Sequence, residues 1–392
     1  MFSSRHFPAA AWLVFLGLVY GPFDAQAGVA PFEFRAGDRV VFLGATLLER
    51  EQDDGYLETL LTARFADKNL TFRNLAWSGD TVWGDSRAGF DTAKEGFERL
   101  VKQVRDAKPG VIVLEFGRNE SFAGDAGLAD FVAGYNRLLD AIADTEARLV
   151  FLGPAKLEAL GAPLPDPAEQ NRNIARYAAA AAEIAGDRGG WYIDLDAAIA
   201  GVRPVAPITF NGMHLTPYGY WIFAQAVLEG LGNHAPRFMA EGLPGFTLNP
   251  KVFFTAPLPA DIAPEVAATE SLHVLRYFPQ EVGSYRLAMG EKIVAEATRE
   301  QWERGVPLAG LPEVARFEEL RAVVKEKNRL FFNRWRPQNE TYIFGFRKHE
   351  QGQYAAEIPQ YDPLIEAEEK KIAELSQLPT AQYTMVRIVE TP

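Results

Sequence analysis

Between Arg39 and about Gly232, short apolar runs alternate with longer stretches whose apolar residues have helical spacing, and this alternation leaves few possible folds. Most of the runs lack the polar alternation of a half-buried strand, as is typical of parallel strands covered on both faces. The intervening stretches are long enough to connect parallel strands. The pattern predicts a three-layer α/β domain with a five-stranded parallel sheet. The predicted strands are Arg39–Gly44, Thr71–Ala76, Val111–Phe116, Leu149–Gly153 and Trp191–Leu195, and the predicted helices lie near 56–66, 97–107, 128–144, 171–185 and 217–231.

Composition excludes several classes of site and partner. The 392-residue chain has no cysteine, which excludes disulfides, cysteine nucleophiles and thiolate-bound metals. A formal charge of −12 provides no basic surface for nucleic acid. The candidate bases are the five histidines, His6, His214, His234, His273 and His349.

The first 27 residues have the pattern of an export signal. Arg5 and His6 precede an apolar run from Ala9 to Tyr20, and Ala25-Gln26-Ala27 follows as a small-residue cleavage site. The run is too short to cross a hydrocarbon core of ~30 Å as a helix, and no later stretch provides an integral membrane span. We expect a mature protein that begins near Gly28 and is periplasmic or extracellular; the alternative is an uncleaved N-terminal anchor.

The rest of the chain divides into three further parts. Residues 28–235 hold the α/β domain, 236–310 a linker and a small β-rich unit, and 311–392 a helical C-terminal region. In the β-rich unit, strands are predicted at 273–277, 284–288 and 292–297. In the C-terminal region, a charged helix carries Phe317, Leu320, Val324 and Phe331 on one face, so it must dock on another surface. A last helix is predicted around Leu364–Leu375.

Polar residues that suit acyl transfer follow the predicted strands. In an open α/β sheet the ligand site lies at the carboxyl ends of the strands. There the sequence supplies a hydroxyl, a glycine amide, an asparagine amide and a histidine, which correspond to nucleophile, oxyanion donors and base. They lie in the segments 44–46, 77–81, 117–121 and 211–217.

These segments, in this order, resemble the blocks of the SGNH (GDSL-type) hydrolases, specifically exported planctomycete-type members with a C-terminal extension. The resemblance covers about residues 38–232, and its most specific parts are Gly117-Arg118-Asn119-Glu120 and the segment from Asn211 to Tyr220. It implies a flavodoxin-like sheet and an esterase or acylhydrolase that uses no metal or other cofactor, often acting on carbohydrate acetyl groups. It also implies that Gly79 and Asn119 stabilise the oxyanion, that His214 is the base and that Thr46 occupies the nucleophile position.

Two positions depart from the family pattern. Thr46 replaces the nucleophilic serine, and its methyl group stiffens and crowds the hydroxyl. Asn211 replaces the acid that normally supports the histidine. A substitute acid would be Asp194, Asp196 or Glu120. The other candidate hydroxyls are Ser78, ranked second to Thr46, and then Ser121 and Thr81; for Ser78 and Thr81 the alternative is a role in capping a turn or helix.

Several polar residues allow two interpretations. Arg334, Arg336 and Asn339 lie in a polar–aromatic segment, 333–353, which suits either sugar or carboxylate recognition or an interdomain clasp in which the arginines pair with acids of the α/β domain. Ser78 and Glu120 are further candidates for substrate contact. His214 has a structural alternative in the turn before a helix that Thr216 and Pro217 would begin. The segment 49–51 is expected to be an ordinary solvated or salt-bridged face.

Two functions follow from this sequence. The first is a secreted ester hydrolase, with a carbohydrate-linked acetyl or similar small acyl group as substrate. The second is a catalytically silent SGNH fold that serves as a glycan-binding or interaction module, because two groups of the expected site are replaced. A metal-dependent reaction is disfavoured, since the chain offers one plausible histidine ligand.

Overall fold

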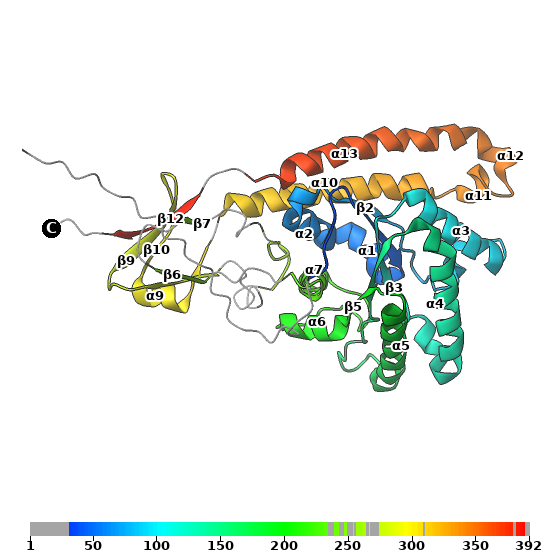
Figure 1. The fold of residues 1–392 in the computed structure, drawn as a ribbon, viewed down its shortest axis with the longest axis horizontal. Coiled ribbons are helices and arrows are strands. Elements are labelled where there is room, and N and C mark those ends of the chain that lie inside the picture. Colours follow the sequence, from blue (N-terminus) through cyan, green and yellow to red (C-terminus); the bar gives the residue numbers. More distant parts are fainter. Residues whose placement is uncertain are drawn as a thin grey trace, which may run out of the picture.

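In a computed structural model of the chain, an α/β domain and a small β unit lie at opposite ends of an elongated molecule (Figure 1). The structure describes residues 31–233, 239–242, 247–248, 254, 256–263, 266, 274–308, 310–378 and 382–388. The predicted export signal, His6, His234 and His273 lie outside the described residues. So does most of the predicted linker.

The predicted five-stranded parallel sheet is confirmed. Its strands are β1 (Arg39–Gly44), β2 (Thr71–Asn74), β3 (Val111–Glu115), β4 (Arg148–Leu152) and β5 (Trp191–Ile193). All neighbouring strands are parallel, in the flavodoxin-like order β2-β1-β3-β4-β5. The chain changes direction across the sheet between β1 and β3, and this is where such folds bind ligands.

Helices cover both faces of the sheet. Val40 and Phe42 of β1 pack on one side, together with residues of α1 (Thr46–Asp54), α2 (Tyr56–Arg64) and α7 (Pro217–Gly230). Val41 and Leu43 point the other way, toward α3 (Ala93–Ala107), α4 (Leu128–Ile142) and α5 (Ala168–Asp187). α6 (Leu195–Val202) follows β5. This two-sided burial explains the continuous apolar strands of the sequence.

Two helices of this domain, α1 and α6, were not predicted. Only Ala45 separates α1 from β1. The expectation that 49–51 is an ordinary solvated or salt-bridged face is wrong for Glu51, which is 1% exposed and is held by backbone N–H groups. Its Oε1 accepts hydrogen bonds from the backbone N–H groups of Leu57, at 2.6 Å, and Glu58, at 3.2 Å, so it caps the start of α2. Burial raises the pKa of the Glu51 carboxyl well above its ordinary value.

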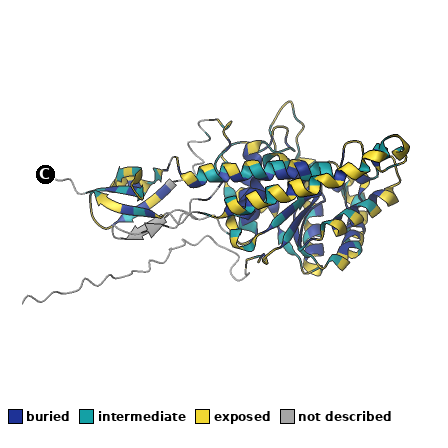
Figure 2. Ribbon diagram, turned by 90° about the horizontal axis from the view of Figure 1, so that it is seen from above, coloured by how far each residue is buried: buried dark blue, intermediate teal, exposed yellow. Residues whose placement is uncertain are grey.

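Two long helices, α10 (Pro312–Trp335) and α13 (Tyr361–Ser376), run side by side along the molecule (Figure 1). The prediction that the charged helix docks through one face is confirmed: Phe317, Leu320 and Val324 are fully buried in the same core as α2 and α7. Figure 2 shows buried residues concentrated beneath these helices and exposed residues along them. The short elements α11 (Glu340–Ile343), α12 (Lys348–Gln351) and η6 (Gly352–Gln360) join the two.

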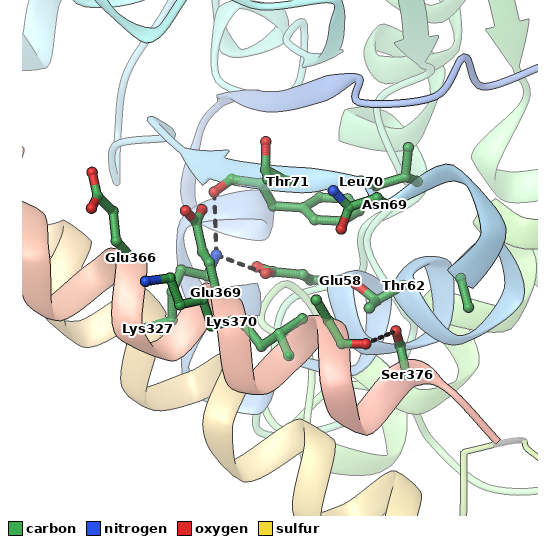
Figure 3. A pocket seen from close by; sticks show the side chains of 14 residues that line it. Glu58, Thr62, Asn69, Leu70, Thr71, Lys327, Glu366, Glu369, Lys370 and Ser376 are labelled. Atoms are coloured by element: carbon green, nitrogen blue, oxygen red, sulfur yellow. Dashed lines mark hydrogen bonds and ion pairs between the residues drawn. The ribbon is translucent and has the colours of Figure 1, made fainter. Parts of the chain in front are cut away.

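A buried ion pair fastens α10 to the α/β domain. Lys327 Nζ lies 2.6 Å from Glu58 Oε1, and it also donates to Phe72 O at 3.2 Å and to Asn328 Oδ1 at 2.8 Å. These groups border a cavity of about 340 Å³ between α2, β2 and α13 (Figure 3). Because the three partners use every donor of the ammonium group, Lys327 holds the two parts of the chain together.

The small β unit has its own hydrophobic core, and its strands form two sheets. The predicted strands correspond to β8 (Val274–Pro279), β9 (Ser284–Met289) and β10 (Lys292–Thr298). β9 and β10 form an antiparallel hairpin, whereas β8 belongs to a different sheet, β11-β8-β6. The unpredicted strand β12 (Tyr383–Ile388) returns from the end of the chain and pairs with β9. The remaining elements are β6 (Met239–Gly242), β7 (Thr247–Leu248), α9 (Arg299–Arg304) and β11 (Val306–Pro307). In the described part of the chain, no helix has the length and apolar character needed to cross a membrane.

Candidate active site

The candidate nucleophile, Thr46, is the first residue of α1 and lies at the carboxyl end of β1. The backbone N–H of Gly79 donates a hydrogen bond to Thr46 Oγ1 at 3.3 Å. Gly79 has a φ of +76°, which side-chain-bearing residues adopt rarely, so a glycine suits this position. The structure therefore brings together two of the groups selected from the sequence.

The loop that carries Gly79 is held by buried polar contacts. Asp80 and Arg87 form an ion pair of 2.7 Å in which both side chains are fully buried. Asp80 Oδ1 also accepts from the Ser86 N–H at 3.1 Å. Asn119, in the turn after β3, donates its side-chain N–H to the backbone carbonyl of Asp80 at 2.8 Å. The Asn119 amide thus lies beside the residue that follows Gly79, with its second N–H available to another acceptor.

Glu120 joins two loops of the candidate site. Its side chain is buried, and its two carboxylate oxygens accept from the backbone N–H groups of Val82, at 2.9 Å, and Gly117, at 2.8 Å. Burial raises the pKa of the Glu120 carboxyl to about 7. Glu120 therefore ties the loop after β2 to the loop after β3, and it also lines a groove beside Asn119. Within residues 31–233, no hydrogen bond joins its carboxylate to His214.

His214 lies in a short hairpin that leads into α7. Glu158 accepts from the N–H groups of Ile208, at 3.1 Å, and Thr209, at 2.9 Å, and this fixes the base of the hairpin. At its tip, Gly212 has a φ of +82°, and a Cβ there would lie 2.9 Å from the Glu158 carbonyl oxygen. The structural expectation for Thr216 also holds: it caps α7 by accepting from Gly219 N at 3.1 Å. This cap does not use the His214 ring.

Asn211 contacts the imidazole in the position that the family reserves for an acid. Its Oδ1 accepts from the backbone N–H groups of Met213, at 3.1 Å, and His214, at 2.9 Å, which fixes the orientation of the amide. Its Nδ2 then lies 2.9 Å from His214 Nδ1, whereas Oδ1 lies 3.2 Å from the same nitrogen. An amide N–H only donates, so the shorter contact favours the tautomer with the proton on Nε2.

The surroundings of His214 favour its neutral form. Burial lowers the pKa of the imidazole, and the positive charges of Arg50 and Arg118 lower it further. Arg118 is buried and donates to Met213 O at 3.2 Å. The exposed ring of Phe210 stacks on His214 with a centroid separation of 5.7 Å. Within residues 31–233, no hydrogen bond joins Thr46 Oγ1 to the His214 ring.

The substitute acids predicted for His214 are engaged elsewhere. Asp194 caps α6 by accepting from Ala197 N at 3.0 Å. Asp196 accepts from Lys156 N at 2.8 Å and pairs with its ammonium group at 3.1 Å. Neither carboxylate hydrogen-bonds to the imidazole, so the predictions that Asp194 or Asp196 supports His214 are wrong. The side chain that contacts His214 Nδ1 is the amide of Asn211.

The alternative hydroxyls have structural partners. Thr81 donates to Asp85 at 2.6 Å and so stabilises its own turn. The buried Ser121 donates to Arg118 O at 2.7 Å. Ser78 donates to the Glu49 carboxylate. Thr46 is thus the candidate that faces a predicted oxyanion donor.

The residues of the polar–aromatic segment separate into two groups. Arg336 reaches the α/β domain, where its Nη1 lies 2.6 Å from Glu49 Oε1. Arg334 instead pairs with Asp362 of α13 at 2.8 Å, and Asn339 donates to Gln351 at 2.7 Å. The clasp interpretation therefore applies to Arg336. Arg334 and Asn339 bind partners within the C-terminal region, so the predicted pairing of Arg334 with an acid of the α/β domain is wrong.

A groove of about 550 Å³ opens beside Asn119. Trp83, Asp130 and Arg137 also line it. The Trp83 indole lies against Gly134 of α4 so closely that a Cβ there would lie 2.4 Å from Nε1. Thr81, Asn119 and Glu120 of its lining belong to the motif segments, but Trp83, Asp130 and Arg137 come from a loop and a helix that carry no motif, so sequence reasoning did not identify the groove. In the described parts of the chain, no cluster of three or more His, Asp or Glu side chains is arranged to hold a metal ion.

Comparisons with known proteins agree with this architecture. Residues 37–222 match the sequence profile of the GDSL-like lipase/acylhydrolase family. No curated protein matches the chain. Among solved structures, a gut microbial diltiazem-metabolizing enzyme is 13% identical with a TM-score of 0.62, over 91% of this chain and 99% of that one. This likeness shows a shared fold that extends beyond the α/β domain. An acetylxylan esterase from Geobacillus stearothermophilus is 17% identical with a TM-score of 0.40, over 51% of this chain and 96% of that one.

Proposed function

The α/β domain belongs to the GDSL-like lipase/acylhydrolase family, and from this premise we propose that the protein hydrolyses esters by acyl transfer to Thr46. The observation that carries the proposal is the 3.3 Å hydrogen bond from Gly79 N–H to Thr46 Oγ1. It joins an oxyanion donor and a hydroxyl at the switch point of the sheet. In the proposed reaction, His214, in the hairpin before α7, is the base, and the Asn119 amide is the second oxyanion donor.

In the first half of the reaction, Thr46 Oγ attacks the ester carbonyl carbon while His214 Nε2 takes the hydroxyl proton. The negative charge that develops on the carbonyl oxygen is stabilised by Gly79 N–H and the free N–H of Asn119. When the carbon–oxygen ester bond breaks, the leaving alcohol takes the proton from His214. Water, deprotonated by the same histidine, then releases the acid and regenerates the Thr46 hydroxyl.

This reaction uses the less favoured tautomer of His214. The imidazole accepts a proton at Nε2 only when Nδ1 carries the other proton and donates it to Asn211 Oδ1, the 3.2 Å contact. The neutral amide also stabilises the resulting imidazolium less than a carboxylate does. We therefore expect slow turnover compared with an enzyme that has an acid at this position.

We further propose that the substrate is a small acyl ester of a carbohydrate. The groove beside Asn119 supports this, because it combines the Trp83 indole with Asp130 and Arg137. An aromatic side chain with neighbouring hydrogen-bonding groups suits a sugar ring, and Asn119, one of the two proposed oxyanion donors, lines the same groove. From the N-terminal sequence pattern, we also propose export to the periplasm or the extracellular space.

Turnover of p-nitrophenyl acetate by the purified protein tests the proposal, with His214→Ala and Thr46→Ala measured beside it. We expect activity that either substitution abolishes. Activity that is absent, or unaffected by His214→Ala, would refute the enzymatic function. Activity that is lost with His214 but retained without Thr46 would move the nucleophile to Ser78 or to water.

A second candidate function is a catalytically silent module that binds glycans or another partner. The contact between Asn211 Nδ2 and His214 Nδ1 supports this candidate, because it opposes the tautomer that a base requires. Such a module would bind acetylated oligosaccharides in calorimetry without releasing acetate, whereas the hydrolase would release it.

A further inference from the structure

The last turn of α10 contacts the loop that carries the oxyanion donor. The Arg336 guanidinium lies 3.6 Å from the centre of the Trp77 ring, and its Nη1 lies 2.6 Å from Glu49 Oε1. The side chains of Arg336 and Glu49 are 25% and 13% exposed, so the ion pair is largely sheltered from solvent. A sheltered, stacked arginine fixes its partner more firmly than a mobile surface pair does.

Glu49 connects Arg336 to the residues around both Thr46 and Gly79. One carboxylate oxygen binds Arg336, and the other accepts the Ser78 hydroxyl hydrogen. Ser78 directly precedes Gly79, while Glu49 lies three residues after Thr46 on α1, which places the two on neighbouring positions of the helix surface. We call Arg336, Glu49 and Ser78 the clasp.

Trp335, the last residue of α10, adds aromatic packing next to the clasp. The rings of Trp335 and Trp77 meet edge to face at 5.7 Å. The buried Arg87 guanidinium lies 5.6 Å from the Trp77 ring and 5.7 Å from the Trp335 ring. Since Arg87 also holds Asp80, the loop around Gly79 is held by α10 as well as by its own domain.

We propose that the C-terminal end of α10 is a working part of the active site. Arg336, the residue directly after this helix, is a positioning residue that holds Gly79 N–H toward the oxyanion through Glu49 and Ser78. The inference rests on the proposed function. Loss of one oxyanion donor lowers kcat by about 10²–10³-fold, and a misplacement of 1 Å by about 10²-fold. A donor that is loosened but not removed should therefore lose about 10–100-fold in kcat, with little change in KM.

The test compares Arg336→Gln with Arg334→Gln. Both substitutions remove one ion pair of α10, but Arg334 pairs with Asp362 inside the C-terminal region. With p-nitrophenyl acetate as substrate, we expect Arg336→Gln to lower kcat at least tenfold with KM within threefold of wild type, and Arg334→Gln to change kcat less than twofold. Equal kcat values for two folded variants would overturn the proposal.

A second variant and a second readout keep the test decisive. If Arg336→Gln does not fold, Glu49→Gln, which keeps the side-chain shape, should give the same loss of kcat; an unchanged kcat would overturn the proposal. If the wild type has no esterase activity, the proposed function fails, and hydrogen exchange of residues 77–83 then decides on the clasp. Faster exchange in the Arg336 variant than in the Arg334 variant supports it, and equal exchange contradicts it.

Discussion

Replacement of Asn211 by aspartate should raise the ester turnover of the protein. Aspartate keeps the oxygen that accepts from the N–H groups of Met213 and His214, so the turn remains intact. It replaces the amide nitrogen, now 2.9 Å from His214 Nδ1, by an oxygen that only accepts. The Nδ1–H tautomer is then favoured, and Nε2 becomes available as a base.

The size of the gain follows from the charge and its exposure. In a serine protease triad, the reverse change lowers kcat about 10⁴-fold, or ~5 kcal/mol of barrier, for a buried acid. Asn211 is exposed, and a pair of unit charges 4 Å apart interacts with about 1 kcal/mol in water and about 4 kcal/mol at an effective dielectric constant of 20. We therefore expect kcat to rise about 10–10³-fold, since ~1.4 kcal/mol corresponds to a factor of ten.

The assay is kcat for p-nitrophenyl acetate across the pH range. Asn69→Asp is the matched control, because Asn69 is also exposed but precedes β2, at the opposite edge of the sheet from Thr46. It should leave kcat unchanged, and His214→Ala in the Asn211→Asp background should remove the gain. A folded Asn211→Asp variant with unchanged or lower kcat would refute the reasoning about the tautomer.

Three further predictions concern the nucleophile, the base and the interdomain contact. Thr46→Ser should raise kcat several-fold because it removes the crowding methyl group; an equal or lower kcat would show that the methyl group does not limit attack. Burial and nearby arginines lower the pKa of His214. We therefore expect kcat/KM to stay constant as the pH falls to below ~6.5, the ordinary histidine pKa, and to decrease only as the imidazole becomes protonated. A decrease in kcat/KM centred above that pH would contradict this. Lys327→Met leaves the Glu58 carboxylate buried without its partner and should cost about 3–5 kcal/mol of unfolding free energy in urea titrations. A loss below 1 kcal/mol would show that the pair does not fasten the domains.

The sequence predicts the sheet well, because its parallel strands are buried on both faces and leave continuous apolar runs. α1 escapes prediction, since only Ala45 separates it from β1 and five of its nine residues are charged. The strand β12 is missed for another reason: its partner β9 lies about a hundred residues earlier in the chain. Pairing across such a distance leaves no local signal.

The candidate site is predicted in part. The motif residues Thr46, Gly79 and Asn119 follow strands β1, β2 and β3 at one edge of the sheet, so topology alone brings them near one another. The contacts that hold them are not visible in the sequence. The partner of Arg336, for example, is fixed by how α10 docks, and Arg334 in the same turn finds a different acid.

Covalent labelling with a fluorophosphonate, which reacts with activated hydroxyl nucleophiles, tests acyl transfer to Thr46 most directly. Peptide mass spectrometry locates the adduct in the wild type and in His214→Ala. We predict modification of Thr46 in the wild type and its loss in the His214 variant. An adduct on Ser78, or no adduct on a folded protein, would contradict the proposed mechanism.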